Sequence, residues 1–289
     1  MLPSATEIVC ALGLESDLVG VTHECDYPPS VREKPVLTAS VLSGHQESGE
    51  IDRHIRALVH AGSSIYRLDA QRLQSLQPDL ILTQELCEVC AVSYPIVERA
   101  VRRMNGATQL VSLEPESLDD VFQTISTVGR LVNRIPRAET VIAELRQRVH
   151  AVRVAIEARP KRRVVCLEWV EPLFGSGHWT PELVRLAGGE ECLGRAGQRA
   201  EPVTADVVAN LHPEVVVVLP CGFGIERTLE EVGRSTVLRK LGGELWVADG
   251  NAYFSRPGPR LVDSLEIMAA ILHPAVMGAP PSAAARRVA

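Results

Sequence analysis

The stretch EVVVVLP at 214–220 constrains the fold of this chain more than any other feature. Its core is a run of valines without the alternation of polar and apolar residues that marks a half-exposed strand. Such a run is typical of a strand buried on both faces of a parallel sheet. Shorter strands are predicted at Leu18–Thr22, Leu80–Thr83, Gln109–Ser112, Arg163–Glu168 and Leu245–Ala248. Helical segments alternate with these strands, so the predicted fold class is α/β with doubly wound sheets.

Two passages repeat one order of elements, DAQRLQSLQPDLILTQELC at 69–87 and TADVVANLHPEVVVVLPCGF at 204–223. Each runs from a short helix through proline and an acidic residue into a buried strand, and then into a loop with a cysteine. The match predicts two similar α/β halves. Between them the pattern predicts a helix over 117–133 and a second over 137–158, with Pro136 beside its first turn. The second helix would be about 33 Å long and suits a spacer.

Composition excludes several classes of protein. With 46% hydrophobic and 23% charged residues and a net charge of -6, the chain is typical of a soluble globular protein without a basic nucleic-acid surface. No apolar run reaches the roughly 18 residues of a membrane span. The first residues as written are not predicted to be a signal peptide, and the odd number of cysteines, 7, fits a reducing compartment. The predicted location is therefore cytoplasmic as written, or periplasmic if a signal lies upstream.

Four segments together resemble a known family: LPSATEIVCALGLESDLVGVTHECDYP at 2–28, LQPDLILT at 76–83, RRVVCLEW at 162–169 and PLFGSGHWTPELVRLAGGEECLG at 172–194. They are similar to the vitamin B12- and iron-siderophore-binding proteins of ABC importers, within the periplasmic-binding-protein-like class III family, and most of all to its cobalamin-binding branch. The resemblance implies two α/β lobes joined by one long α-helix, with a corrinoid ligand in the cleft between lobes and no enzymatic activity. It implies an N-terminal lobe at 1–135, a linking helix at 136–159 and a C-terminal lobe at 160–274. The Ala- and Pro-rich tail at 275–289 is predicted to be disordered.

The chain departs from the family pattern in several places. The family docks on an ABC permease through one acidic residue on each lobe, and the aligned positions are Gln71 and Asp206, so one acid is an amide here. A strand expected before PSATE is reduced to Met1 and Leu2. An extra segment at 43–69 has helical spacing of apolar residues, and it either caps the cleft or packs on its own lobe.

Ligands of open parallel sheets bind beyond the carboxyl ends of the strands. Only 4% of the residues are aromatic, yet several aromatic residues follow the predicted strands, where their faces suit a large flat ring. The Gly-rich loop GSGHW predicts an exposed Trp179, whereas Trp169 either faces the ligand or packs in the core. His178 either binds a metal or forms a hydrogen bond. The candidate ligand-binding residues are Glu24, Cys25, Tyr27, Glu168, Trp169, Phe174, His178, Trp179, Phe223, Tyr253, Phe254 and Arg256.

Four cysteines also follow predicted strands: Cys25, Cys87, Cys90 and Cys221. Such a set could hold zinc or an iron–sulfur cluster, so a cytoplasmic metal-binding protein is the alternative to a corrinoid carrier. An iron-siderophore carrier is a less favoured reading, because Arg256 is the only obvious arginine among these loops. The motifs of common hydrolases, P-loop enzymes and zinc proteases are absent from the sequence, and no catalytic residue is predicted.

Overall fold

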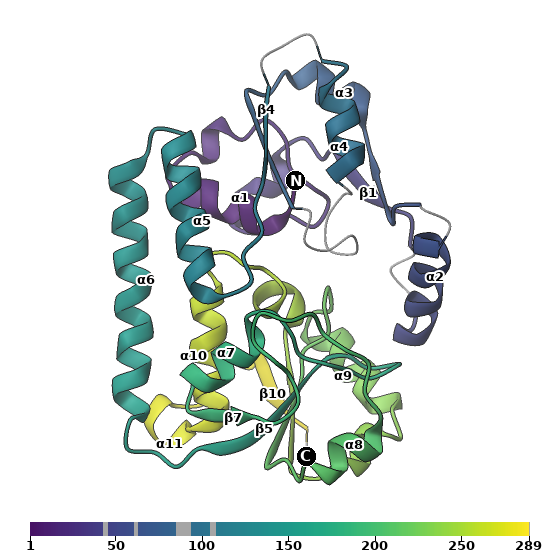
Figure 1. Ribbon diagram of the computed structural model, residues 1–289, viewed down its shortest axis with the longest axis vertical. Helices are drawn as coiled ribbons and strands as arrows, with labels where there is room; N and C mark the ends of the chain where they lie inside the picture. The colour runs from purple at the N-terminus through teal and green to yellow at the C-terminus, as the bar shows by residue number, and fades with distance from the viewer. Residues whose placement is uncertain (43–45, 61–62, 85–93, 105–107, 289) are drawn as a thin grey trace. The chain divides into compact units, whose positions relative to one another are not determined.

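The computed structural model describes residues 1–42, 46–60, 63–84, 94–104 and 108–288, which form two compact units. Unit 1 comprises Met1–Gln46, Glu50–Pro115 and Phe122–Val141. Unit 2 comprises Glu47–Gly49, Glu116–Val121 and Ile142–Ala289. Figure 1 shows the helices and strands of both units.

Unit 1 is built on two small sheets. In chain order its elements are α1 (Pro3–Ala11), η1 (Glu15–Asp17), η2 (Pro29–Glu33), β1 (Thr38–Ser40), α2 (Ser48–His60), β2 (Tyr66–Leu68), α3 (Ala70–Leu76), β3 (Leu80–Thr83), α4 (Tyr94–Val101), β4 (Gln109–Ser112) and α5 (Leu118–Leu131). Helices α2 and α5 begin in unit 2 and continue in unit 1. Strands β1 and β2 pair antiparallel, and β3 and β4 pair parallel. The apolar core between α3, α4 and the β3–β4 pair contains Leu73, Ile81 and Val97.

Unit 2 is built on one larger sheet. After α6 (Ile135–Ile156), which begins in unit 1, its elements are β5 (Arg162–Trp169), β6 (Phe174–Gly175), α7 (Thr180–Leu186), β7 (Gly189–Glu191), α8 (Ala205–Asn210), β8 (Val215–Val218), α9 (Ile225–Arg234), η3 (Leu238–Lys240), β9 (Glu244–Ala248), η4 (Gly250–Phe254), α10 (Leu261–Leu272), α11 (Pro274–Met277) and β10 (Ala285–Arg287). The strand order is β10-β9-β8-β5-β6, with β7 also paired to β5.

The valine run is the centre of this sheet. Strand β8 pairs parallel with β5 on one side and with β9 on the other, and Val215 to Val218 are all fully buried. This confirms the prediction of a parallel strand covered on both faces. Because β5, β8 and β9 run in one direction, the residues that follow Trp169, Val218 and Ala248 emerge at the same edge of the sheet.

The two matched passages have the same local geometry. Asp69 caps α3 by accepting from the Arg72 amide, and Thr204 caps α8 by accepting from the Val207 amide. Each helix is followed by a residue with left-handed backbone, Gln77 with φ 43° and His212 with φ 46°. A proline, an acidic residue and the buried strand come next. The prediction that the two passages share one order of elements is therefore confirmed. Gln71 and Asp206 are exposed second residues of α3 and α8.

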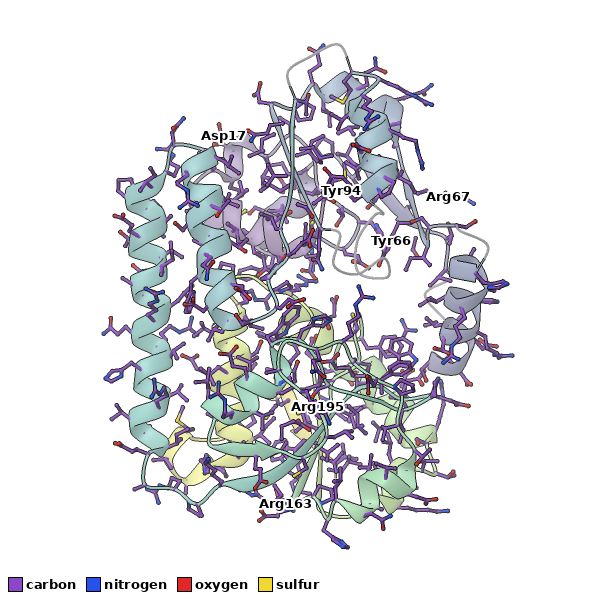
Figure 2. The ribbon with its side chains drawn as sticks, in the orientation of Figure 1. Asp17, Tyr66, Arg67, Tyr94, Arg163 and Arg195 are labelled. Carbon is purple, nitrogen blue, oxygen red and sulfur yellow. The ribbon has the colours of Figure 1, made fainter. Side chains whose placement is uncertain are left out.

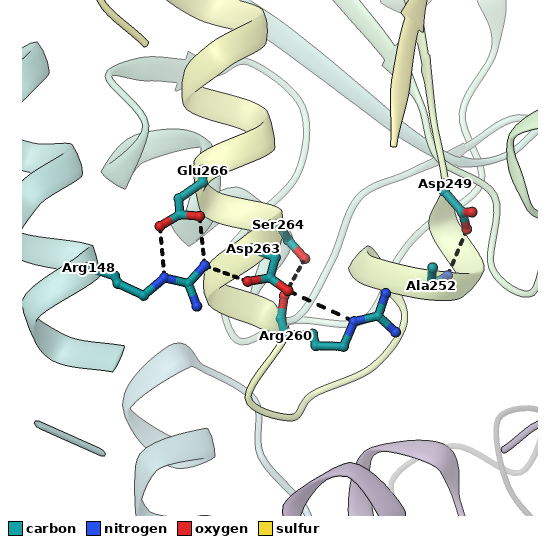
Figure 3. A network of polar contacts seen from close by, with 7 residues as sticks. All are labelled: Arg148, Asp249, Ala252, Arg260, Asp263, Ser264 and Glu266. Atoms are coloured by element: carbon teal, nitrogen blue, oxygen red, sulfur yellow. Dashed lines mark hydrogen bonds and ion pairs between the residues drawn. The ribbon is translucent and has the colours of Figure 1, made fainter. Parts of the chain in front are cut away.

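Helix α6 is tied to α10 by the charged network of Figure 3. The Arg148 guanidinium donates from Nε and Nη2 to the two carboxylate oxygens of Glu266, at 2.9 and 2.6 Å, and from Nη2 to Asp263 at 2.5 Å. Hydrogen bonding to Glu266 raises the pKa of Arg148, so the guanidinium stays charged. The predicted long helix at 137–158 is confirmed. It begins at Ile135 and ends at Ile156, two residues earlier than predicted at each end, with Pro136 in its first turn.

Two sequence predictions are wrong. The tail at 275–289 is not disordered over its described part, because α11 and β10 form there and β10 pairs antiparallel with the edge of β9. Small alanines fit closely against the sheet, and Arg286 and Arg287 pair with Glu226 and Glu244. The strand predicted at Leu18–Thr22 is reduced to one bridge between Val21 and Val36. Local composition did not reveal either pairing partner.

Gly250 keeps the loops after β8 and β9 close together. A Cβ atom at this position would lie 2.1 Å from the Pro220 carbonyl oxygen and 2.7 Å from that of Leu219. We expect Gly250→Ala to lower the free energy of unfolding by about 3 kcal/mol, because backbone at the sheet edge would have to move. Urea unfolding followed by circular dichroism measures this change.

The matched control is Gly233→Ala in α9, where a new Cβ meets nothing within 4 Å. Alanine is the better helix former, so we expect this variant to be more stable than the wild type by about 0.5 kcal/mol. Equal stability of the two variants would contradict the proposed close approach at Gly250.

Candidate functional site

Aromatic and arginine side chains gather where β5, β8 and β9 end in unit 2. We call the set Trp169, Phe223, Arg227, Tyr253 and Arg260 the carboxyl-edge cluster. The loops that carry it are joined by backbone hydrogen bonds, from the Cys221 amide to the Glu168 carbonyl at 3.2 Å and from the Asn251 amide to the Phe223 carbonyl at 3.1 Å. These bonds join the three loops, which come from parts of the chain far apart in the sequence.

Phe223 lies at the centre of the first half of this cluster. Its ring centroid is 5.1 Å from that of Trp169, and the Arg227 guanidinium carbon is 3.6 Å from it, within the range of a cation–π interaction. Phe223 is only 2% exposed, whereas Trp169 and Arg227 are half-buried. Burial lowers the pKa of Arg227, partly offset by Glu231 and Glu230 on the same helix. Trp169 and Arg227 are thus the side chains that a ligand can reach here.

A second arginine–aromatic pair forms the other half of the cluster. Arg260, just before α10, places its guanidinium carbon 4.6 Å from the ring centroid of Tyr253, which lies in the π-helical turn after β9. Its Nε also lies 3.9 Å from an Asp263 oxygen, as Figure 3 shows. Position after a strand predicts Tyr253 but not Arg227 or Arg260, because neither arginine directly follows a strand.

The first residue of α2 is held against this cluster within unit 2. Ser48 is 1% exposed, and its hydroxyl donates to Glu231 at 2.7 Å while its amide donates to the same carboxylate at 3.2 Å. The Trp169 indole N–H donates to the Ser48 carbonyl at 3.2 Å and to the Glu171 carbonyl at 3.1 Å. These bonds fix the orientation of the Trp169 ring. No sequence pattern indicated a functional role for Ser48 or Glu231.

Three predicted ligand residues point inward instead. Trp179 is 7% exposed and donates from its indole N–H to the Phe254 carbonyl at 2.7 Å, so the prediction that it is exposed is wrong. Phe254 and Arg256 are also buried, with Arg256 donating to the Asn251 side chain at 3.3 Å. The glycines of GSGHW serve close packing: a Cβ at Gly177 would lie 2.4 Å from the Ala200 amide nitrogen.

Residues around that loop have structural contacts. The Gly177 amide donates to the Glu168 carboxylate at 3.1 Å, and His178 adopts a left-handed φ of 48°. The His178 ring lies 5.5 Å from that of Trp179, and its Nδ1 is buried with no hydrogen-bond partner among the residues that the structure describes. Burial lowers the pKa of His178. Phe174 is half-buried in β6 opposite Trp169.

Unit 1 holds the other predicted ligand residues. Tyr66, which Figure 2 labels, donates from its hydroxyl to the Glu24 carboxylate at 3.2 Å. Tyr27 is 46% exposed and accessible to a ligand. Cys25, in contrast, is buried, with its sulfur 3.2 Å from the hydroxyl oxygens of both Thr6 and Thr22. Cys25 is therefore a small core residue of unit 1.

The predicted cysteine metal site has no support from the structure. Among the described parts of the chain, no group of three or more His, Cys, Asp or Glu side chains is arranged to hold a metal ion. Cys25 belongs to unit 1 and Cys221 to unit 2, and Cys87 and Cys90 lie outside the described residues.

Comparison with known proteins matches the sequence to the periplasmic binding protein family over residues 2–242. A vitamin B12-binding protein of Vibrio cholerae is 21% identical over 273 residues, covering 92% of this chain and 85% of that protein. A cobalamin-binding protein of Halobacterium salinarum is 25% identical over 281 residues, covering 94% of this chain and 68% of that protein. In none of the described helices is there a stretch long and apolar enough to cross a membrane.

A solved structure of similar fold is a periplasmic heme-binding protein from Pseudomonas aeruginosa. It superposes with a TM-score of 0.67 at 20% identity, covering 99% of this chain and 92% of that one. At this identity the likeness concerns the fold alone. The fold class predicted from the sequence, α/β with two lobes, is confirmed.

Buried histidines make the stability of unit 2 depend on pH. Burial lowers the pKa of His178 and of His273 below the ordinary 6.5. As the pH falls, the unfolded chain therefore takes up protons first, and the free energy of unfolding decreases from about pH 6.5 downward. We expect His178→Asn to lose less stability than the wild type between about pH 7 and about pH 5. Asparagine tolerates the left-handed backbone.

Thermal unfolding across this pH range measures the effect, with His150→Asn on the exposed face of α6 as the control. A pH dependence of His178→Asn equal to that of the wild type and of the control would contradict the assignment.

The Ser48–Glu231 contact gives a separate prediction. We expect Ser48→Ala to lower the free energy of unfolding by about 1–2 kcal/mol, because a buried carboxylate loses its hydroxyl donor. The same substitution at exposed Ser16 should change stability by less than about 0.5 kcal/mol. Chemical unfolding of both variants measures the difference, and equal midpoints would show that the contact contributes nothing.

Proposed function

Because this chain belongs to the periplasmic binding protein family, we propose that it binds a corrinoid, a cobalamin-like ligand, at the carboxyl-edge cluster of unit 2. Members of the family are solute-binding proteins of ABC importers, act in the periplasm or outside the cytoplasm, and are not enzymes. The expectation of a cytoplasmic protein therefore has no support.

The half-buried face of Trp169 is the observation that carries this proposal. Its indole is held in place by two carbonyl groups and by Phe223, so little rotamer freedom is lost when a ring packs on it. Tyr253 offers a further half-buried aromatic ring on the neighbouring loop. A corrin ring is large and flat, and such ligands are bound through aromatic area with a few polar groups at the margin. The names of both relatives support a corrinoid.

Several finer predictions stay predictions. Glu24 and Tyr27 of unit 1 remain candidate ligand contacts, as do Glu168, Phe174 and His178 of unit 2. A ligand cleft between the lobes also remains a prediction. For the permease, we propose that exposed Asp206 at the start of α8 makes the contact typical of the family. Gln71, at the same position of α3, would contribute a neutral hydrogen bond at most.

Heme is the second candidate ligand. The arginine–aromatic pairs at Arg227 and Arg260 favour it, because carboxylates at the margin of a planar chelate would meet positive charge there. The sequence disfavours an iron-siderophore carrier because Arg256 is the only obvious arginine among the loops after the strands. In the structure Arg256 is buried, whereas Arg227 and Arg260 lie near the ends of the strands, so an anionic chelate is less disfavoured.

The proposed function is tested by titration with cyanocobalamin and hydroxocobalamin, followed by calorimetry and absorption spectroscopy. We expect binding by the wild type and roughly tenfold weaker binding by Trp169→Leu, because an aromatic face is lost. The control is Trp246→Leu, a half-buried tryptophan in β9 whose indole donates to Glu244. No heat and no spectral change with either ligand at high micromolar concentration would refute corrinoid binding.

A further inference from the structure

A short segment at the start of α2 is bound by unit 2. Residues 47–49, Glu-Ser-Gly, belong to unit 2, whereas the parts of the chain on both sides of them belong to unit 1. We call residues 47–49 the latch. Its buried residue is Ser48, which donates from its hydroxyl and from its amide to the Glu231 carboxylate, at 2.7 and 3.2 Å. The latch is thus attached to unit 2 mainly through one carboxylate.

The side chains of the latch contribute polar contacts and no apolar burial, because none of its three residues is apolar. Besides the bonds of Ser48, the Glu47 carboxylate lies 3.6 Å from the Arg234 guanidinium, and both of these side chains are exposed. An exposed ion pair of this kind contributes little to stability. A few hydrogen bonds to one carboxylate hold a segment far less firmly than a hydrophobic core does, so the latch can detach while the sheet stays folded.

Trp169 keeps a hydrogen bond when the latch detaches. Its indole N–H lies 3.2 Å from the Ser48 carbonyl oxygen and 3.1 Å from the Glu171 carbonyl oxygen. Because one N–H is shared between two acceptors, Glu171 remains as a partner after Ser48 leaves. The indole can then turn about the single remaining bond. The latch therefore decides whether the orientation of Trp169 is fixed by two acceptors or by one.

Glu231 makes the detached state the minor one. Its side chain is 8% exposed, and it loses both donors of Ser48 when the latch leaves. A buried carboxylate that loses its hydrogen-bond donors is destabilised. The attached state is therefore favoured, and the detached state is reached by local opening.

We infer that the latch is a two-state element, attached or detached, and that a ligand packed on Trp169 favours the attached state. The coupling to the ligand rests on the proposed function. A ring on the indole excludes water from the neighbouring bonds to Glu231, which strengthens them. An attached latch in turn presents an indole that is already fixed, so less conformational freedom is lost on binding. The two effects are reciprocal: the factor by which the ligand favours attachment is the factor by which attachment tightens binding.

Hydrogen exchange followed by NMR tests the latch without any ligand. We expect the Ser48 amide to exchange roughly tenfold or more faster than the Val217 amide of β8, which is paired within the sheet and exchanges only on global unfolding. Ser48→Ala should speed exchange of the residue-48 amide by roughly tenfold to hundredfold, since a hydroxyl bond to a carboxylate is lost. Glu231→Gln should act in the same direction. Exposed Ser16→Ala is the control and should leave the exchange unchanged.

The coupling is tested with saturating cyanocobalamin, which should slow exchange of the wild-type Ser48 amide by roughly tenfold. Ser48→Pro removes both donors to Glu231, and proline is tolerated at the first residue of α2. This variant holds the latch detached, so calorimetry should show cyanocobalamin binding weakened by the same factor. The matched control is Ala70→Pro, at the exposed first residue of α3, which should bind like the wild type.

Other results would overturn the inference. A Ser48 amide that exchanges as slowly as the Val217 amide shows that the latch does not detach by itself. Exchange that cyanocobalamin leaves unchanged, or Ser48→Pro that binds cyanocobalamin like the wild type, removes the coupling and leaves the proposed function standing. A wild type that binds neither cyanocobalamin nor hydroxocobalamin contradicts the proposed function and the coupling together, whereas exchange measured without ligand still decides whether the latch detaches.

Discussion

The parallel pairing of β5, β8 and β9 is the constraint on which unit 2 depends. Four valines of β8 are completely removed from water, and their amide and carbonyl groups are paired on both sides by the neighbouring strands. Burial of this kind requires that both faces be covered, which the surrounding helices achieve. Because the strands share one direction, their following loops meet at one edge. The carboxyl-edge cluster is a consequence of this pairing.

Close packing restrains the loops after the strands and the side chains that they carry. Gly250 allows the loop after β9 to approach the carbonyls after β8, and Phe223 packs against Trp169 and Arg227. The buried Ser48–Glu231 contact holds the carbonyl that orients the Trp169 indole. Aromatic and guanidinium groups that are already restrained lose less conformational entropy on binding a rigid planar ligand than flexible groups would lose.

Several parts of the fold could be predicted because their signals are local. The valine run, the capping residues Asp69 and Thr204 and the spacing of apolar residues along α6 all act within one element. The candidate site was only partly predictable. Position after a strand identified Trp169 and Tyr253, but it also selected Trp179, Phe254 and Arg256, which the structure buries. Arg227 and Arg260 were missed because each lies one helical turn or more beyond its strand.

The α/β class, the parallel direction of the central strands and the shared order of elements in the two halves are encoded locally in the chain. They follow from periodicity and capping, which depend on neighbours along the chain. Which loop residues face solvent, that Cys25 packs in a core and that β10 pairs with β9 became clear only from the folded molecule. The same composition of aromatic, arginine and cysteine residues suits a core or a ligand surface. The choice depends on contacts between residues far apart in sequence, which no local pattern records.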